Sequence, residues 1–331
     1  MFIIVNTMPI SNTHERPLLQ LDPWMPEYEG SVEIDPADGS ASGVDPTVEE
    51  SIWKGIKVPP VDFPPPLYFI DGVRRTEARV LAWSAGTMVH GLLGTVAAGT
   101  VRSEGRVACF EACLVRRFLI LGGGYKRSTR VRVGNITVEF EGFASVSTAP
   151  GELGSELQEL MRQLEARVAE GVIRDDKLVF IDGPLAYISS LGPVVGVIKR
   201  ISQPYLDSAH FDLVASLSVG ERTPLFLISD GKRDRFSWYL RVGERRSFDH
   251  TLTGIIRLEV RAVVGLDNAQ RLANTSAALL VRFSSVATRD PRAPQNLVPI
   301  GALENELRRR MGDPLIMRRG IEQRIFEGVE L

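Results

Sequence analysis

The stretches Leu67-Tyr-Phe-Ile-Asp-Gly-Val-Arg-Arg75 and Leu178-Val-Phe-Ile-Asp-Gly-Pro-Leu185 decide the fold class of this chain. Each begins with a run of large apolar residues, which predicts a buried β-strand, and each continues directly into an Asp-Gly step at Asp71 or Asp182. A carboxylate that follows a buried strand is costly to desolvate unless it meets a metal ion, a basic side chain or hydrogen-bond donors. Two such strands could deliver their carboxylates to one divalent-metal site for phosphate chemistry. Alternatively, both steps are ordinary turns that end strands.

The segment directly before the second of these strands has the pattern of a long amphipathic helix. Over residues 151–172, apolar residues recur three and four positions apart, with Glu and Arg on the opposite face. A strand, a helix and a second strand in succession are typical of an α/β fold. Glu165 lies next to the apolar stripe and could reach the functional end of the following strand. Other acids compete for this role or form a solvated face: Glu156, Glu159 and Glu170.

Apolar and β-branched runs on both sides of this helix predict further strands. They cover residues 78–84, 89–101, 108–121 and 136–143 before the helix, and residues 194–201, 225–228, 236–241 and 255–260 after it. Two more helices are predicted at residues 268–278 and 300–311. We therefore expect one main α/β domain over residues 67–331.

Residues 1–66 differ in composition from the rest of the chain, since they are rich in Pro, Asp, Glu and Gly. This predicts an extended, largely irregular arm with one short helix at about residues 48–56, beginning after Asp45-Pro-Thr. The arm would pack on the domain or meet a partner through its aromatic residues, Trp24, Tyr28 and Trp53.

The composition limits the classes of function. Apolar residues make up 44% of the 331 residues and charged residues 24%, which is typical of a soluble globular protein. The formal net charge is -2, so binding to nucleic acid would need local basic patches. Cys109 and Cys113 are too few for a disulfide framework and have no nearby His for a zinc site. The sequence has no recognisable signal peptide or membrane-spanning run, so we expect a cytoplasmic protein with no membrane partner.

Basic residues stand at two informative places. Lys199 and Arg200 end an apolar run and would contact phosphate beside a metal–carboxylate site, although strand-end solvation explains them equally well in isolation. The Arg-rich stretch 116–132, which includes Lys126 and Arg127, could form a groove that follows a nucleic-acid backbone or the solvent face of a β-hairpin. The sequence has no P-loop, no dinucleotide-binding motif and no Ser-His spacing typical of hydrolases.

Four motifs in order resemble the NurA-type nucleases over about residues 67–310: Phe-Ile-Asp71-Gly-x-Arg, Met161-Arg-x-x-Glu165, Leu-Val-Phe-Ile-Asp182-Gly-Pro-Leu and Gly196-Val-Ile-Lys199-Arg. The resemblance implies an RNase H-like mixed sheet flanked by helices, behind the extended Pro-rich arm. It also implies that Asp71, Glu165 and Asp182 hold one or two divalent ions, Mn2+ or alternatively Mg2+, and that Lys199 faces the cleaved phosphate. The implied partners are DNA, a second copy of the chain in a homodimer, and a HerA-type hexameric ATPase.

The C-terminal motif departs from this family. The family ends in a Pro-x-Pro-Leu-x-x-Ala-His-like element whose His assists at the metal site, whereas the comparable stretch here is Asn296-Leu-Val-Pro-Ile-Gly-Ala-Leu-Glu304. Glu304 stands where the His would be, and we expect it to act as a further metal ligand. The expected DNA contacts are basic residues near the first strand, in the Arg-rich stretch and after Lys199: Arg74, Arg75, Lys126, Arg127 and Arg200.

These observations lead to three hypotheses for the function. The first is a divalent-metal-dependent deoxyribonuclease, exo- or endonucleolytic, that processes DNA ends with a hexameric translocase. The second is a non-catalytic DNA-binding adaptor on the same fold that docks to an ATPase through the N-terminal arm. The third is a hydrolase of small phosphate esters, which would use the same carboxylates but has no special use for the Arg-rich stretch.

Overall fold

The computed structural model describes most of the chain after residue 42, together with a short N-terminal piece. The described residues are 18–21, 43–59, 65–84, 86–105, 107–201, 205–231, 233–286, 288, 290 and 292–329. Trp24 and Tyr28, which we expected to anchor the N-terminal arm, lie outside them. Among the described residues, no helix is both long enough and apolar enough to cross a membrane.

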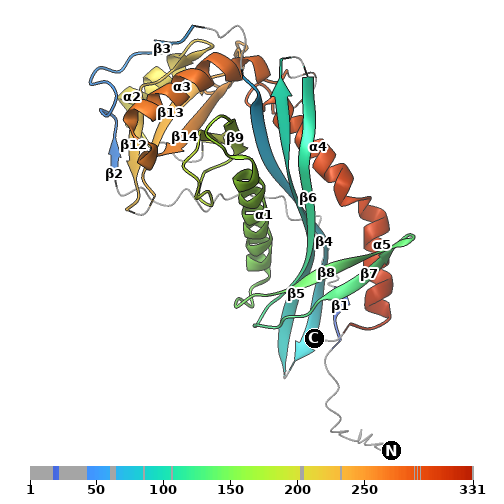
Figure 1. Cartoon of the computed structure of the whole chain (residues 1–331). Helices are drawn as coiled ribbons and strands as arrows, with labels where there is room; N and C mark the ends of the chain where they lie inside the picture. Colours follow the sequence, from blue (N-terminus) through green and yellow to red (C-terminus); the bar gives the residue numbers. More distant parts are fainter. Residues whose placement is uncertain are drawn as a thin grey trace, which may run out of the picture.

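Three long antiparallel strands form the centre of one mixed sheet (Figure 1). They are β4 (Leu67–Ser84), β5 (Thr87–Glu104) and β6 (Val107–Leu121). Two shorter strands extend the sheet beside β4: β9 (Leu178–Asp182) runs parallel to β4, and β10 (Val194–Ile198) runs parallel to β9. The order β6-β5-β4-β9-β10 therefore joins an antiparallel part to a parallel part at the β4–β9 boundary.

The remaining strands continue the sheet on both sides. Beyond β10 come β14 (Ile255–Arg261), β13 (Arg235–Arg241), β12 (Phe226–Ser229) and β2 (Gly43–Asp45), and beyond β6 come β8 (Ile136–Ala144) and β7 (Thr129–Val133). Short pairings add β1 (Gln20–Leu21) to β4 and join β3 (Ile56–Lys57) through β11 (Glu221–Arg222) to β13.

Helices cover both faces of this sheet (Figure 1). On one face, α1 (Pro150–Val172) packs across β4, β5 and β6. On the other face lie α3 (Leu266–Leu280) and α4 (Val298–Met311), while α5 (Pro314–Phe326) packs on β7. The helix α2 (Ser208–Ser216) follows β10, and two short 3-10 helices flank α3 at Ala262–Val264 and Val281–Phe283. The expected mixed sheet flanked by helices is confirmed.

Strand β4 contributes to two hydrophobic cores, because successive side chains of a strand point to opposite faces. Ile70 packs among residues of α1, whereas Phe69 and Val73 pack among residues of α3 and α4. Asp71 has the same parity as Phe69 and Val73. This alternation therefore directs the Asp71 carboxylate toward α4.

Strand β4 is longer than the sequence pattern predicts. Separate strands were expected at residues 67–73 and 78–84, but one strand covers both, with a bulge between Thr76 and Ala78. The polar residues at its middle bind one another: Arg75 pairs with Glu77 at 2.8 Å, and the Thr95 hydroxyl of β5 donates to the same carboxylate. Because these groups are satisfied, the strand continues through a polar stretch.

The prediction of a short helix at residues 48–56 is wrong. Turns and bends follow β2, and β3 begins at Ile56. The Glu49 carboxylate instead accepts hydrogen bonds from the Arg222 guanidinium at 2.7 and 2.9 Å and from the backbone N–H of Leu225 at 2.6 Å. The Trp53 ring lies edge-on to the His210 ring, with 4.7 Å between the ring centroids. This part of the arm therefore packs on the sheet.

Candidate metal centre

Asp71 and Asp182 lie side by side because their strands are parallel and in register. Ile70 of β4 pairs with Ile181 of β9, so the next residue of each strand is the acid. Strand β9 ends at Asp182, and Gly183 adopts a φ of 112°, a conformation that favours glycine. The expectation that two Asp-Gly steps deliver carboxylates to one place thus has a direct structural basis.

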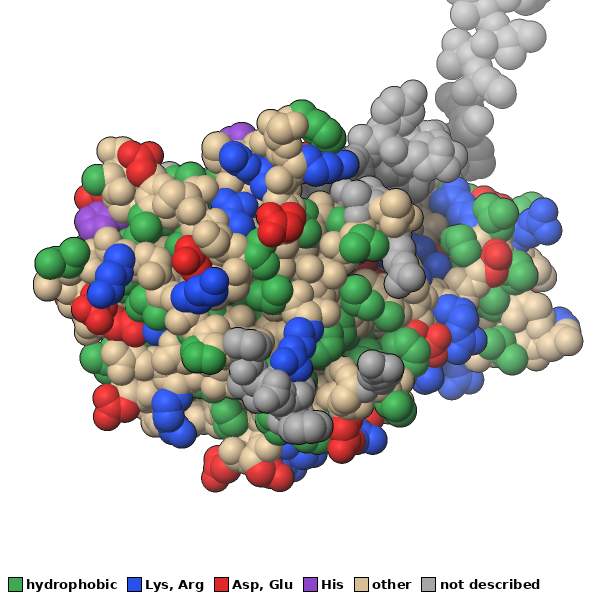
Figure 2. Space-filling model, turned by 90° about the horizontal axis from the view of Figure 1, so that it is seen from above, with side chains coloured by type: hydrophobic (Ala, Val, Ile, Leu, Met, Phe, Trp, Pro, Cys, Tyr) green, Lys and Arg blue, Asp and Glu red, His purple; other side chains and the backbone are tan. Residues whose placement is uncertain are grey.

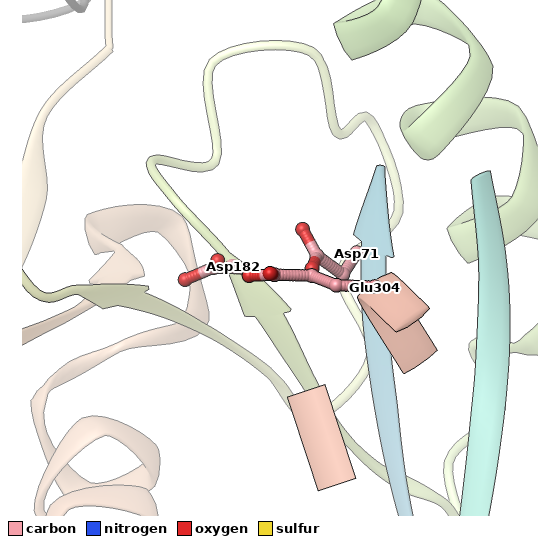
Figure 3. A group of neighbouring side chains, drawn as sticks. All are labelled: Asp71, Asp182 and Glu304. Carbon is pink, nitrogen blue, oxygen red and sulfur yellow. The ribbon is translucent and has the colours of Figure 1, made fainter. Parts of the chain in front are cut away.

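Glu304 brings a third carboxylate to the same place. It lies on α4, which covers the face toward which Asp71 points, and the three side chains converge (Figure 3). One carboxylate oxygen from each of Asp71, Asp182 and Glu304 lies within 4.8 Å of the other two. Asp71 and Glu304 are buried and Asp182 is half-buried. The structure therefore brings together three of the four expected metal ligands.

Glu165 approaches from α1, on the opposite side of β4. Its carboxylate lies beside Gly72, where the missing side chain leaves room for it. Its Oε2 accepts a hydrogen bond from Arg162 at 2.9 Å, and Arg162 also donates to the backbone oxygen of Asp182 at 2.8 Å. Glu165 is therefore a near neighbour of the group of three, although its oxygens are not part of that group.

Lys199 lies beside the acids, where the sequence places it. Its Nζ contacts Asp182 Oδ2 at 2.8 Å and donates to Asn296 Oδ1 at 2.7 Å. Arg292 makes a two-fold hydrogen bond to Glu304, at 2.7 and 2.9 Å. Sequence reasoning missed the roles of Arg292 and Asn296. Both lie in an irregular segment before α4, and the one available signal was the presence of polar residues next to the motif that contains Glu304.

Burial dominates the electrostatics of the centre. It raises the pKa of Asp71 well above its usual value, and the nearby Asp182 charge adds to this effect while Lys199 opposes it. Burial also raises the pKa of Glu165 to about 7, against the stabilising effect of Arg162 on the charged form. Each of these two acids has one buried oxygen without a hydrogen-bond partner, Asp71 Oδ2 and Glu165 Oε1.

These features fit a divalent cation. Buried carboxylate oxygens without donors are costly unless a cation or another donor satisfies them. The donor set consists of oxygen atoms only, which suits hard cations such as Mg2+ and Mn2+. Asp71, Asp182 and Glu304 are the residues placed to hold such an ion.

Two of the expected DNA contacts, Arg74 and Arg75, bind groups of α1 and at the end of α4. Arg74 donates to Gln158 of α1 at 2.5 Å, and Arg75 donates to the backbone oxygen of Gly312 at the end of α4 at 2.9 Å. Arg200 is exposed and adjoins Lys199. On the face shown in Figure 2, the described Lys and Arg side chains are interspersed with Asp and Glu.

Lys126 and Arg127 follow β6 at the far end of the long strands. Leu121, the last residue of β6, pairs with Gly91 of β5, whereas Asp71 pairs with Gly99. Gly91 and Gly99 are eight positions apart, which corresponds to roughly 25 Å along a strand. Contact of these two basic residues with DNA stays a prediction, and would occur away from the carboxylates.

Comparison with known families gives a direct assignment. The sequence model described as the NurA domain matches residues 57–300. The chain belongs to the NurA domain family. The match includes Asp71, Glu165, Asp182 and Lys199 and ends before Glu304.

A solved structure related to this NurA-domain chain is that of the NurA nuclease from Sulfolobus solfataricus. The two sequences are 10% identical, and the TM-score is 0.45 over 77% of this chain and 81% of the other. A comparison with curated proteins gave no match.

Proposed function

We propose that this NurA-domain chain is a divalent-metal-dependent nuclease that hydrolyses phosphodiester bonds in DNA. The observation that carries the proposal is the convergence of Asp71, Asp182 and Glu304, with ligand oxygens within 4.8 Å of one another, at the edge where two parallel strands meet. Membership in the NurA domain family supports a nuclease over other phosphate hydrolases.

The residues of the centre have separate roles in this reaction. Asp71, Asp182 and Glu304 would hold the ion, which when bound lowers the pKa of a coordinated water and stabilises the leaving oxygen. The Lys199 ammonium, next to Asp182, is placed to donate to a phosphate oxygen as negative charge develops there. Glu165 adds a buried carboxylate from the α1 side, and Arg162 holds it in place.

The resemblance supports further parts of the proposal. We assign Mn2+ as the preferred ion, with Mg2+ as the alternative, and both suit a site built from oxygen ligands. We also propose that a homodimer works with a HerA-type hexameric ATPase in DNA end processing. Because the net charge of the chain is only -2, delivery of DNA by such a partner would compensate for weak electrostatic attraction by the nuclease itself.

The test is Mn2+-dependent degradation of single- and double-stranded DNA by the wild type, Asp71→Ala and Asp182→Ala. We expect both variants to lose activity. The control is Asp176→Ala, which changes an exposed acid near the other end of β9 and should leave the degradation of DNA intact. Circular dichroism would verify that all variants are folded. Equal degradation by all four proteins would show that the assigned centre is wrong.

The second candidate function is a non-catalytic adaptor. The pairing of Glu304 with Arg292 supports it, because Arg292 then occupies one of the three carboxylates. This function predicts binding to a HerA-type ATPase without cleavage of DNA in Mn2+ or Mg2+. Hydrolysis of a chromogenic phosphate ester without cleavage of DNA would instead favour the small-ester hydrolase.

A further inference from the structure

We propose that Arg292 is an internal counter-cation of the centre, that a divalent ion displaces it from Glu304, and that the released guanidinium then binds a DNA phosphate. The inference rests on the proposed nuclease function. It adds a link between metal binding and DNA binding, and it assigns a role to a residue outside the four sequence motifs.

Basic side chains neutralise most of the acids around the centre. Three of the four acids have a basic partner at 2.7 to 2.9 Å: Glu165 with Arg162, Asp182 with Lys199, and Glu304 with Arg292. Glu304 also has a longer contact, at 3.8 Å, with Arg308. Among the described residues, the contacts of Asp71 include a backbone N–H at 2.8 Å but no basic side chain. The basic side chains thus neutralise part of the negative charge that a divalent ion would otherwise neutralise.

Two of these cations are linked by hydrogen bonds through residues that precede α4. Lys199 donates to Asn296, Asn296 donates to Asp290, and Asp290 accepts from the backbone N–H of Arg292 at 2.8 Å. Asn296 is fully buried. Asn296 and Asp290 therefore connect the cation on Asp182 with the cation on Glu304.

Of the three cations that lie 2.7 to 2.9 Å from the acids, Arg292 is the most exposed. Its side chain is 52% exposed, compared with 16% for Lys199 and 20% for Arg162. It can therefore move into water with little loss of packing. Lys199 is held by Asp182 and Asn296, whereas Arg292 is held by Glu304 and, at 3.4 Å, by Asp290.

Arg292 and a metal ion would compete for the same oxygens of Glu304. Arg292 donates a hydrogen bond from a different nitrogen to each of the two carboxylate oxygens of Glu304. An ion held by Glu304 needs at least one of these oxygens. A divalent charge next to the guanidinium would also repel it. The planar fork that binds a carboxylate at two points binds a phosphate equally well, so Arg292 has an alternative partner when DNA is present.

The inference predicts that metal and DNA bind cooperatively. Without metal, Arg292 is bound to Glu304 and contributes little to DNA binding. With metal, it becomes available for a phosphate beside the centre. Since coupling between two ligands is reciprocal, DNA should also favour metal binding.

The experiment compares the wild type with Arg292→Gln and, as a matched control, with Arg309→Gln, an exposed arginine of α4 that pairs with Glu306. Isothermal calorimetry with Mn2+ alone measures the metal affinity. Fluorescence anisotropy measures the affinity for a labelled phosphorothioate oligonucleotide with and without Mn2+.

We expect Arg292→Gln to bind Mn2+ roughly fivefold more tightly than the wild type. We expect Mn2+ to strengthen DNA binding by the wild type and by Arg309→Gln but not by Arg292→Gln. If Arg292→Gln does not fold, Arg292→Lys tests the same point, because a lysine cannot occupy both oxygens of Glu304 and should also yield more readily to Mn2+.

Unchanged or weaker Mn2+ binding by Arg292→Gln overturns the inference, as does an equal effect of Mn2+ on DNA binding in all proteins. These readouts are independent of cleavage. If the wild type cleaves DNA with Mn2+ while the Arg292 results are negative, only the inference fails. If Arg292→Gln binds Mn2+ more tightly but no protein cleaves DNA, the proposed function fails and the inference about the counter-cation stands.

Discussion

The Glu165 carboxylate occupies the space beside Gly72 where a side chain would begin. A Cβ at residue 72 would lie 2.7 Å from Glu165 Cγ and 2.8 Å from Oε1. The first Asp-Gly step therefore has two functions: Asp71 points to α4, and Gly72 admits an acid from α1 on the opposite face.

This relationship predicts the effect of Gly72→Ala. The new methyl group should displace Glu165 and lower the rate of Mn2+-dependent DNA cleavage by about 100-fold, while the protein remains folded. The control is Gly154→Ala in α1, where a Cβ would meet no atom within 4 Å. Full activity of Gly72→Ala would mean that cleavage does not need Glu165 in this position.

The second prediction concerns Asp71 and pH. The pKa of Asp71 is raised in the folded state. As the pH rises above 3.8, the unfolded state releases a proton that the folded state still binds. This group therefore makes the metal-free protein less stable as the pH rises from 3.8 toward the raised pKa. Asp71→Asn removes the charge and should increase the free energy of unfolding at pH 8. This increase should become smaller as the pH is lowered. Urea unfolding in EDTA at several pH values measures this difference. Added Mn2+ should stabilise the wild type more than Asp71→Asn.

The third prediction concerns Gly183, the glycine of the second step. Its φ of 112° disfavours any other residue, and a Cβ there would lie 2.8 Å from Arg162 Nη1. We expect Gly183→Ala to lower the free energy of unfolding by about 2–4 kcal/mol. Gly86→Ala separates the two causes, because Gly86 has a φ of 78° with open space around it, and it should cost only about 1 kcal/mol. Equal losses in urea unfolding would exclude a contribution from Arg162.

The fourth prediction concerns Glu259 of β14, which is 2% exposed. It accepts a hydrogen bond from the backbone N–H of Leu185 at 3.0 Å and pairs with Arg257 at 2.8 Å, so it holds the segment that follows Asp182. We expect Glu259→Ala to lower the free energy of unfolding by about 3–5 kcal/mol, because it leaves buried basic groups without their acid. A loss below about 1 kcal/mol in urea unfolding would contradict a structural role for this carboxylate.

The sequence predicted the parts of the centre that depend on local pattern. Apolar runs ending in Asp71 and Asp182 identify strands. The parallel pairing of Ile70 with Ile181 is known only from the structure, because four further strands and α1 separate β4 from β9 along the chain. Patterns of this kind do not report which face of a strand a partner covers. The positions of Glu165 and Glu304 on opposite sides of β4 therefore emerge only from the packing of α1 and α4.

Two errors have local physical causes. After Asp45-Pro-Thr, the Asp45 carboxylate accepts hydrogen bonds from the backbone N–H of Thr47 at 2.8 Å and from its hydroxyl at 2.6 Å, which favours a turn over the expected helix. The polar stretch within β4 suggested a break, but Glu77 finds partners in Arg75 and in Thr95 of the next strand.

Arg292 was missed because its partner Glu304 is twelve residues away across a segment without periodicity.

The third carboxylate of the centre comes from α4, more than a hundred residues after the second. A ribosome-bound chain that has not yet released residues 298–311 can pair β4 with β9 but holds only Asp71 and Asp182 in place. The complete ligand set therefore forms only after α4, which follows all the strands of the sheet in the chain, has packed on that sheet. In a nuclease, this order of assembly would delay DNA cleavage until α4 is in place.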